Sequence, residues 1–202
     1  SSMPHIPVVL LHSHQHLTTN IMQYFRAIQP STIRCHCPAH THSEEGSTKM
    51  TNCSCQKGYT GPDGGTCEAC DVGRFKDVNG SVACTLCLQG TYSTATAAVS
   101  ESTCTVCPSY TFSGLGSIAL TNCTCQKGYT GPDGVECTAC AAGTYKDVNG
   151  SSPCSPCAEG KYSTETGEIS ESTCSDCPAN THSEEGSKMM TNCTCRKGYT
   201  GP

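Results

Sequence analysis

One stretch of the sequence decides the fold: CSCQKGYTGPDGGTC, residues 53–67. It returns 70 residues later as CTCQKGYTGPDGVEC, residues 123–137. Aligning 53–122 on 123–192 without a gap gives 41 identities in 70 positions. Self-similarity at one fixed period indicates a repeat architecture, in which each unit packs mainly on its neighbours.

The repeat also fixes the domain organisation. The segment 37–52 matches 177–192 at 13 of 16 positions but matches 107–122 at only 8, which indicates two alternating versions of the repeat. The sequence also stops within a repeat, so we expect a piece of a longer array. We divide the chain into a poorly ordered non-repeat segment (1–34), a partial repeat (35–52), two full units (53–122 and 123–192) and the start of another repeat (193–202).

Composition favours disulfides over a conventional core. The chain has 20 Cys among 202 residues, three Phe and no Trp. Few large apolar side chains are left to offset the conformational entropy lost on folding. Cysteine at this density is typical of secreted disulfide scaffolds, so we expect an extracellular protein, either secreted or the ectodomain of a membrane protein.

Charge and hydropathy restrict the partners. The net charge of −5 is spread along the chain and forms no basic stripe for nucleic acid. No apolar run approaches the roughly 20 residues of a membrane span. We therefore expect no span within this fragment, and a signal peptide and any anchor outside it.

Each 70-residue unit divides into four similar quarters. A quarter opens with a cysteine, places a ring four or five residues later and closes on the next cysteine pair. The ring positions are Phe75, Tyr92, Phe112 and Tyr129 in one unit, then Tyr145, Tyr162, His182 and Tyr199. Asn79-Gly80 and Asn149-Gly150 are tight-turn signals. We predict that each quarter is an irregular two-stranded loop whose ring packs on a disulfide, with little helix.

Two disulfide schemes fit the spacing. A ladder joins the second cysteine of each pair to the first of the next, and it leaves Cys35 and Cys195 unpaired. A crossed scheme joins Cys87 to Cys107 and Cys104 to Cys123. The favoured bonds are 55–67, 70–84, 125–137 and 140–154, which use Cys55, Cys67, Cys70, Cys84, Cys125, Cys137, Cys140 and Cys154.

A zinc site is the rival interpretation, because the spacing Cys67-x2-Cys70-x13-Cys84-x2-Cys87 is close to a four-cysteine zinc motif. Disulfides are favoured because every quarter carries such a pair and the intervening loops lack the basic residues of nucleic-acid fingers. Candidate N-glycosylation sequons also fit a secretory route. They begin at Asn52, Asn79, Asn122, Asn149 and Asn192.

The motifs resemble known extracellular modules. The C-x-C-x2-G-Y-x7-C spacing of 53–67 is similar to the C-terminal half of an EGF-like module. The following cysteine pairs, with Gly-Thr-Tyr145 between Cys140 and Cys154, resemble the ephrin type-A/B receptor-like repeat and, more distantly, tumour-necrosis-factor-receptor repeats. The likeness covers about 37–202 and implies a small disulfide-rich fold, an elongated tandem array of short β-hairpins and irregular loops.

The sequence contains few residue patterns that suggest a catalytic or metal-binding site. His12, His14 and His16 would share one face of an extended strand, but a solvated tract is favoured. We expect His42 and His182 to pack in their ring slots, Asp63 and Asp133 to serve their turns, and Glu44-Glu45 and Glu184-Glu185 to be solvated loop tips. We expect no enzyme, no cofactor and no metal.

Two functions follow. The first is a structural or adhesive rod, part of a larger protein, which binds other protein or glycan surfaces or copies of itself. The second is the ligand-binding ectodomain of a receptor, which would require one unit with distinctive exposed aromatic or Arg anchors. An intracellular zinc-binding array is third.

Overall fold

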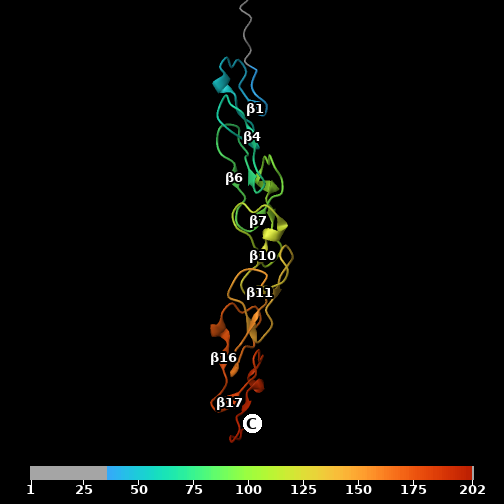
Figure 1. The fold of residues 1–202 in the computed structure, drawn as a ribbon, viewed down its shortest axis with the longest axis vertical. Helices are drawn as coiled ribbons and strands as arrows, with labels where there is room; N and C mark the ends of the chain where they lie inside the picture. Colours follow the sequence, from blue (N-terminus) through green and yellow to red (C-terminus); the bar gives the residue numbers. More distant parts are fainter. Residues whose placement is uncertain (1–35, 202) are drawn as a thin grey trace, which may run out of the picture.

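The computed structural model describes residues 36–201. Within this range the chain is an elongated array whose loops follow one another from the N-terminal to the C-terminal end, in sequence order (Figure 1). Each loop is a hairpin of two antiparallel strands, and every strand has two residues. The tandem disulfide-rich architecture of short hairpins and irregular loops is therefore confirmed.

Nine hairpins make up the described range, and each is a separate two-stranded sheet. The first five are β1 (Thr41–His42) with β2 (Ser54–Cys55), β3 (Tyr59–Thr60) with β4 (Glu68–Ala69), β5 (Arg74–Phe75) with β6 (Thr85–Leu86), β7 (Thr91–Tyr92) with β8 (Thr105–Val106), and β9 (Thr111–Phe112) with β10 (Thr124–Cys125). The last four are β11 (Tyr129–Thr130) with β12 (Thr138–Ala139), β13 (Thr144–Tyr145) with β14 (Ser155–Pro156), β15 (Lys161–Tyr162) with β16 (Ser175–Asp176), and β17 (Thr181–His182) with β18 (Thr194–Cys195).

Helix is confined to short 3-10 turns just before a cysteine. They are η1 (Met50–Asn52), η2 (Glu101–Thr103), η3 (Leu120–Asn122), η4 (Glu171–Thr173) and η5 (Met190–Asn192). In η2 and η4 the hydroxyl of the preceding residue, Ser100 or Ser170, accepts a hydrogen bond from the backbone N–H of Ser102 or Ser172. No helix in the described part of the chain is long and apolar enough to span a membrane.

Most of the buried apolar side chains in the core are cysteines. Among the described residues, 13 apolar side chains are buried, and all but Phe75 and Ala98 are cysteines. Two-residue strands make too few hydrogen bonds to hold a hairpin alone, because a single isolated hairpin is marginal in water even when its strands are longer. The disulfides therefore provide both the closure and most of the interior.

Two ring slots differ from their expectation, and in one of them Tyr199 is 54 % exposed. The side chain of His42 is 47 % exposed, and its Nε2 lies 3.7 Å from a carboxylate oxygen of Glu44. The predicted packing role is therefore wrong for His42, because the polar imidazole takes the solvated side of its strand. The prediction suits Phe75, which is 8 % exposed.

Removing one disulfide should loosen the array locally. We expect the double variant Cys87→Ala/Cys104→Ala to lose about 3 kcal/mol of local stability, the estimate for a loop of roughly 15 residues. Hydrogen exchange should rise in 87–104 and the adjoining loops, and stay unchanged beyond residue 140. The matched variant Cys157→Ala/Cys174→Ala should move the effect to 157–174. Uniform loss of protection along the whole chain would contradict this local behaviour.

Candidate functional site

The described disulfides form one regular ladder. Each joins the second cysteine of a pair to the first cysteine of the next pair, with sequence separations of 12, 14, 16 or 17 residues. The bonds are 37–53, 55–67, 70–84, 87–104, 107–123, 125–137, 140–154, 157–174 and 177–193. The four bonds favoured from the sequence are among them, and the crossed arrangement of Cys87, Cys104, Cys107 and Cys123 is not.

The ladder also decides between disulfide and zinc. The four cysteines with zinc-like spacing belong to three different disulfides, 55–67, 70–84 and 87–104. A bonded sulfur is not a thiolate and does not ligate zinc. Within 36–201, no three His, Cys, Asp or Glu side chains are placed to hold a metal ion. Cys35 and the His12, His14 and His16 tract lie outside the described residues.

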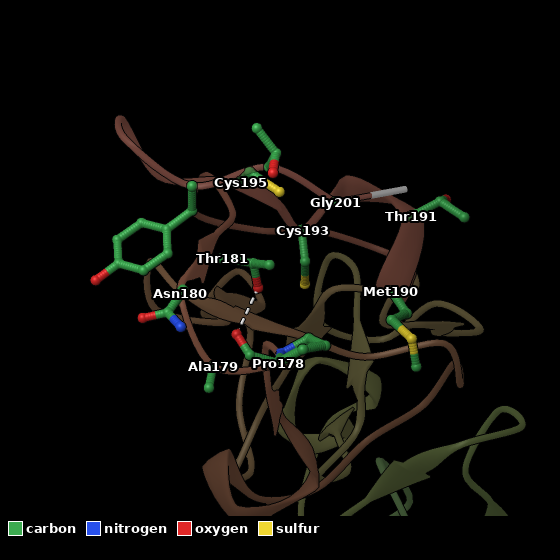
Figure 2. A pocket seen from close by; sticks show the side chains of 11 residues that line it. Pro178, Ala179, Asn180, Thr181, Met190, Thr191, Cys193, Cys195 and Gly201 are labelled. Carbon is green, nitrogen blue, oxygen red and sulfur yellow. Dashed lines mark hydrogen bonds between the residues drawn. The ribbon is translucent and has the colours of Figure 1, made fainter.

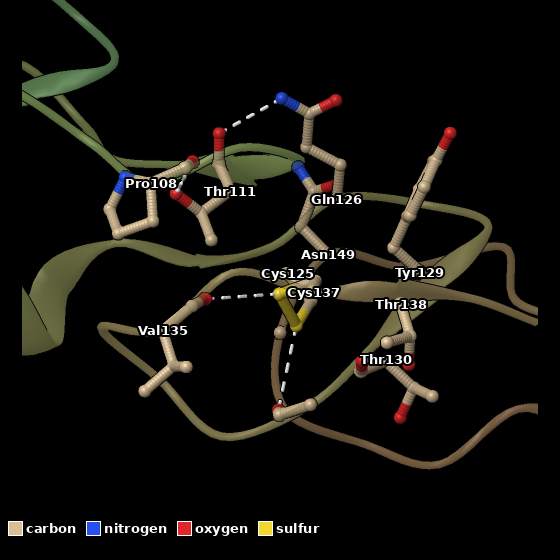
Figure 3. Close-up of a disulfide and its surroundings, with 12 residues drawn as sticks. Pro108, Thr111, Cys125, Gln126, Tyr129, Thr130, Val135, Cys137, Thr138 and Asn149 are labelled. Carbon is tan, nitrogen blue, oxygen red and sulfur yellow. Dashed lines mark hydrogen bonds between the residues drawn. A yellow bond between two sulfur atoms is a disulfide. The ribbon is translucent and has the colours of Figure 1, made fainter.

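The loop 125–137 shows how a disulfide sits in its surroundings (Figure 3). Cys125 is fully buried, and its Sγ lies 3.5 Å from the carbonyl oxygen of Gly131. Gln126 donates from its side-chain Nε2 to the carbonyl of Thr111 in the preceding loop. The disulfide closes this loop, and the Gln126 amide attaches it to the one before it.

We name each loop by the two cysteines of the disulfide that closes it. Successive loops are connected by backbone hydrogen bonds, and we call the contact between two loops a joint. Between loops 70–84 and 87–104, Gly73 donates to the carbonyl of Ser93 at 2.8 Å. Across the same joint Ala97 donates to the carbonyl of Cys70, and Phe75 forms an isolated parallel bridge with Ala98. The corresponding bonds recur in the second unit, for example from Gly143 to Ser163. The joint is therefore a repeated structure in which backbone hydrogen bonds link one hairpin to the next.

Two glycines in equivalent places, Gly73 and Gly90, differ in how closely other backbone atoms approach them. They precede successive hairpins with φ of +73° and +78°. A Cβ at Gly73 would collide with the carbonyl oxygen of Gly116, two loops further on, whereas a Cβ at Gly90 would meet no atom within 4 Å. Of these two glycines, therefore, Gly73 alone makes a close backbone contact that a side chain would prevent.

After six of the rings, the next residue is a buried polar group that sequence reasoning missed. Lys76 and Lys146 are each only 2 % exposed. The Nζ of Lys76 donates to the carbonyl of Tyr59 in the preceding loop at 2.6 Å, and also to the carbonyl of Gly80. In loop 107–123 the same slot holds Ser113, whose hydroxyl donates back to Thr91. The signal was present, since Lys or Ser recurs after the ring at 76, 93, 113, 146, 163 and 183.

Burial changes the proton affinity of these two lysines. Desolvation lowers the pKa of Lys76 and of Lys146 below the ordinary value of 10.5. The carboxylates of Asp63 and Asp133 act in the opposite direction and raise it. The two turn aspartates thus also compensate part of the charge that the joint buries.

A second kind of joint precedes the CxC loops. There the residue before the hairpin is not glycine, yet it is left-handed: His40, Tyr110 and Asn180 have φ of 59°, 60° and 64°. The Tyr110 ring stacks on Tyr129 with centroids 4.3 Å apart, and the His40 ring stacks on Tyr59 at 4.0 Å. Ring stacking across the loops therefore accompanies the strain that a non-glycine residue bears in this conformation.

The five candidate glycosylation residues are all exposed. Asn79 and Asn149 lie at joints, where each side-chain oxygen accepts a bond of 3.0 Å from the backbone N–H of Lys57 or Lys127 in the preceding loop. Asn52, Asn122 and Asn192 instead end 3-10 turns, directly before a disulfide-bonded cysteine.

A pocket of about 530 Å³ lies at the C-terminal end of the described range (Figure 2). Met190, Asn180 and Tyr199 line it together with Cys195, whose thiol is free and exposed. None of its described lining residues is a His or a carboxylate, so the pocket offers the Cys195 thiol no base.

These features define a tandem array of disulfide-closed modules, and one comparison finds a family that resembles them. The model of the family described as tyrosine-protein kinase ephrin type A/B receptor-like matches residues 58–104 and 128–172. These two segments are therefore cysteine-rich repeats of the ephrin-receptor-like kind. No curated protein matches the chain significantly. The repeats and their disulfides indicate an extracellular module.

The two glycines provide a matched test of the joint. Gly73→Ala and Gly90→Ala both place a side chain at left-handed φ, which costs roughly 1–2 kcal/mol. We expect Gly73→Ala to be clearly more destabilising, because it must also displace the Gly116 carbonyl, and to raise proteolysis near residues 93–98 and 116. Denaturant unfolding and limited proteolysis measure the difference. Equal losses in the two variants would show that the close approach contributes nothing.

The buried lysines should make stability depend on alkaline pH. Because folding lowers their pKa, the native state binds fewer protons than the unfolded state between the native pKa and 10.5. The unfolding free energy should therefore rise as pH increases through that interval. Urea unfolding of the parent and of Lys76→Met/Lys146→Met isolates the contribution, since tyrosine ionisation is common to both. The same pH dependence in both proteins would refute it.

Proposed function

We propose that the chain is a segment of an extracellular structural or adhesive rod, in which the ladder of disulfides and joints fixes the spacing of successive loops. One observation carries the proposal: the same joint geometry recurs at equivalent places in both units. The bonds from Gly73 to Ser93 and from Gly143 to Ser163 have the same length of 2.8 Å. A structure built by repeating one contact gains length with each loop and needs no central core.

A ligand-binding unit would present exposed anchors that its neighbour lacks. Some large exposed side chains recur one period apart, as with Val78 and Val148. Others do not, since Val106, Tyr110 and Leu115 correspond to Asp176, Asn180 and Glu185. The choice of a rod over a receptor therefore rests on the recurring joints. We assign the segment no catalytic role, and we propose protein or glycan surfaces, or further copies of the chain, as its partners.

Small-angle scattering on the monomeric, oxidised chain tests the rod. A compact domain of 202 residues would have a radius of gyration of roughly 17 Å. We expect a clearly larger value together with a skewed distance distribution. Reduction should convert the profile to that of a flexible chain, because the closures are covalent.

Gly90→Ala serves as a control that should keep the parent profile. A radius near the compact value for the oxidised monomer would refute the rod. A ligand that binds one unit tightly, with no binding to the other, would support the receptor ectodomain instead.

A further inference from the structure

The five sequons belong to two structural classes. Asn52, Asn122 and Asn192 begin Asn-Cys-Ser/Thr sequences, whereas Asn79 and Asn149 begin Asn-Gly-Ser sequences. The spacing of 70 residues separates Asn79 from Asn149, so the second class occurs once in each unit.

Each Asn-Cys sequon has its middle residue in a disulfide, and the sequon at 122–124 is held by the fold at all three of its residues. In the example at 122–124, Asn122 ends η3 and its Oδ1 accepts bonds from the backbone N–H groups of Ile118 and Ala119. Cys123 is fully buried in the 107–123 disulfide, and Thr124 lies in β10 opposite Phe112. Such a sequon is withdrawn from an enzyme as soon as its disulfide forms.

The order of synthesis increases this difference. Cys123 pairs with Cys107, which lies 16 residues upstream and enters the oxidising compartment first. The bond can therefore form when the sequon has only just emerged. The loop around Asn79 closes through Cys70 and Cys84, and Cys84 follows the sequon. Asn79 thus remains in an open chain until after it has passed the entry point.

The Asn-Gly sequons also have room for a sugar after folding. A Cβ at Gly80 or Gly150 would meet no atom within 4 Å. The Oδ1 of Asn149 accepts from the Lys127 N–H, and no hydrogen bond of its Nδ2 occurs within the described range. Asn149 also borders an open groove of about 400 Å³ with Phe112, Gln126 and Lys127, where an apolar ring lies beside amide groups. An N-acetylated sugar suits such a surface.

We propose that the chain carries N-linked oligosaccharide on Asn79 and Asn149, in preference to Asn52, Asn122 and Asn192. This inference rests on the extracellular setting proposed above. The donor is an oligosaccharide linked to a lipid diphosphate. The bond from sugar C1 to the diphosphate oxygen breaks, C1 bonds to the asparagine Nδ2, Nδ2 loses one proton, and the lipid diphosphate leaves.

The consequence is a regular decoration of the array. One glycan per unit stands at the joint between loops 55–67 and 70–84, and again between 125–137 and 140–154. The asparagine oxygen bonds that join these loops remain, because glycosylation uses the nitrogen. The sugar therefore covers the joint without displacing it.

Site occupancy in a secreted sample tests the proposal. The full 202-residue chain is expressed behind a secretion signal in mammalian cells, deglycosylated enzymatically in H₂¹⁸O and mapped by mass spectrometry. We expect ¹⁸O-labelled Asp at 79 and 149, with several-fold lower labelling at 52, 122 and 192. Ser81→Ala/Ser151→Ala keeps both asparagines but destroys their sequons, and it should remove two mobility steps on a gel.

The controls separate this proposal from the rod. Asn52→Gln/Asn122→Gln/Asn192→Gln should leave the parent mobility nearly unchanged. A reducing agent during synthesis should raise occupancy at the three Asn-Cys sequons towards that of Asn79. Unmodified Asn79 and Asn149 in a secreted, fully disulfide-bonded chain, or equal occupancy at all five, would overturn the proposal. Neither result affects the scattering test, which reports on the rod alone.

Discussion

The covalent closing of each short loop is the constraint on which the rest of the structure depends. No hairpin in the described range has strands longer than two residues, and the buried apolar side chains are nearly all cysteines. Such a loop has too little surface to bury and too few hydrogen bonds to order its backbone. Closing a loop of 12 to 17 residues removes much of that entropy from the unfolded chain. The interior of the array consists largely of the bonds that close it.

Closed loops alone would form a flexible string, and the joints account for the order between them. Each joint uses backbone groups that short hairpins leave free, as when Gly73 donates to Ser93 and Cys87 donates to Gly73. A buried unpaired backbone group would be costly, so satisfying it in the next loop fixes the relative placement of the two. The Nζ of Lys76 extends this logic to a side chain, since it binds carbonyls from two loops at once.

The sequence predicted the parts that depend on residue type. Cysteine spacing indicated the four favoured bonds, because each disulfide requires two cysteines with Cα atoms about 5.6 Å apart, and nearby partners meet this in short loops. The spacing left the ladder and the crossed scheme open, because Cys104 and Cys107 are both near enough to Cys87. The joints were not predicted from the sequence, because they consist of backbone hydrogen bonds. Every residue type other than proline has a backbone N–H and C=O, so the sequence does not show which of these groups bond to the next loop. Lys76 escaped because an isolated lysine is usually solvated. His42 was misplaced because a ring slot was equated with burial.

Comparing the two units shows which positions carry the geometry. The loop tip changes from Gly114-Leu115 to Glu184-Glu185 and the second-turn residues from Gly65-Thr66 to Val135-Glu136. Gly73, Lys76 and Asn79 instead have identical counterparts at 143, 146 and 149, and all three make contacts across a joint. Surface chemistry thus varies where the relative placement of loops does not. For such an array, the property held constant is the step from one loop to the next, which a spacer requires and a single binding surface does not.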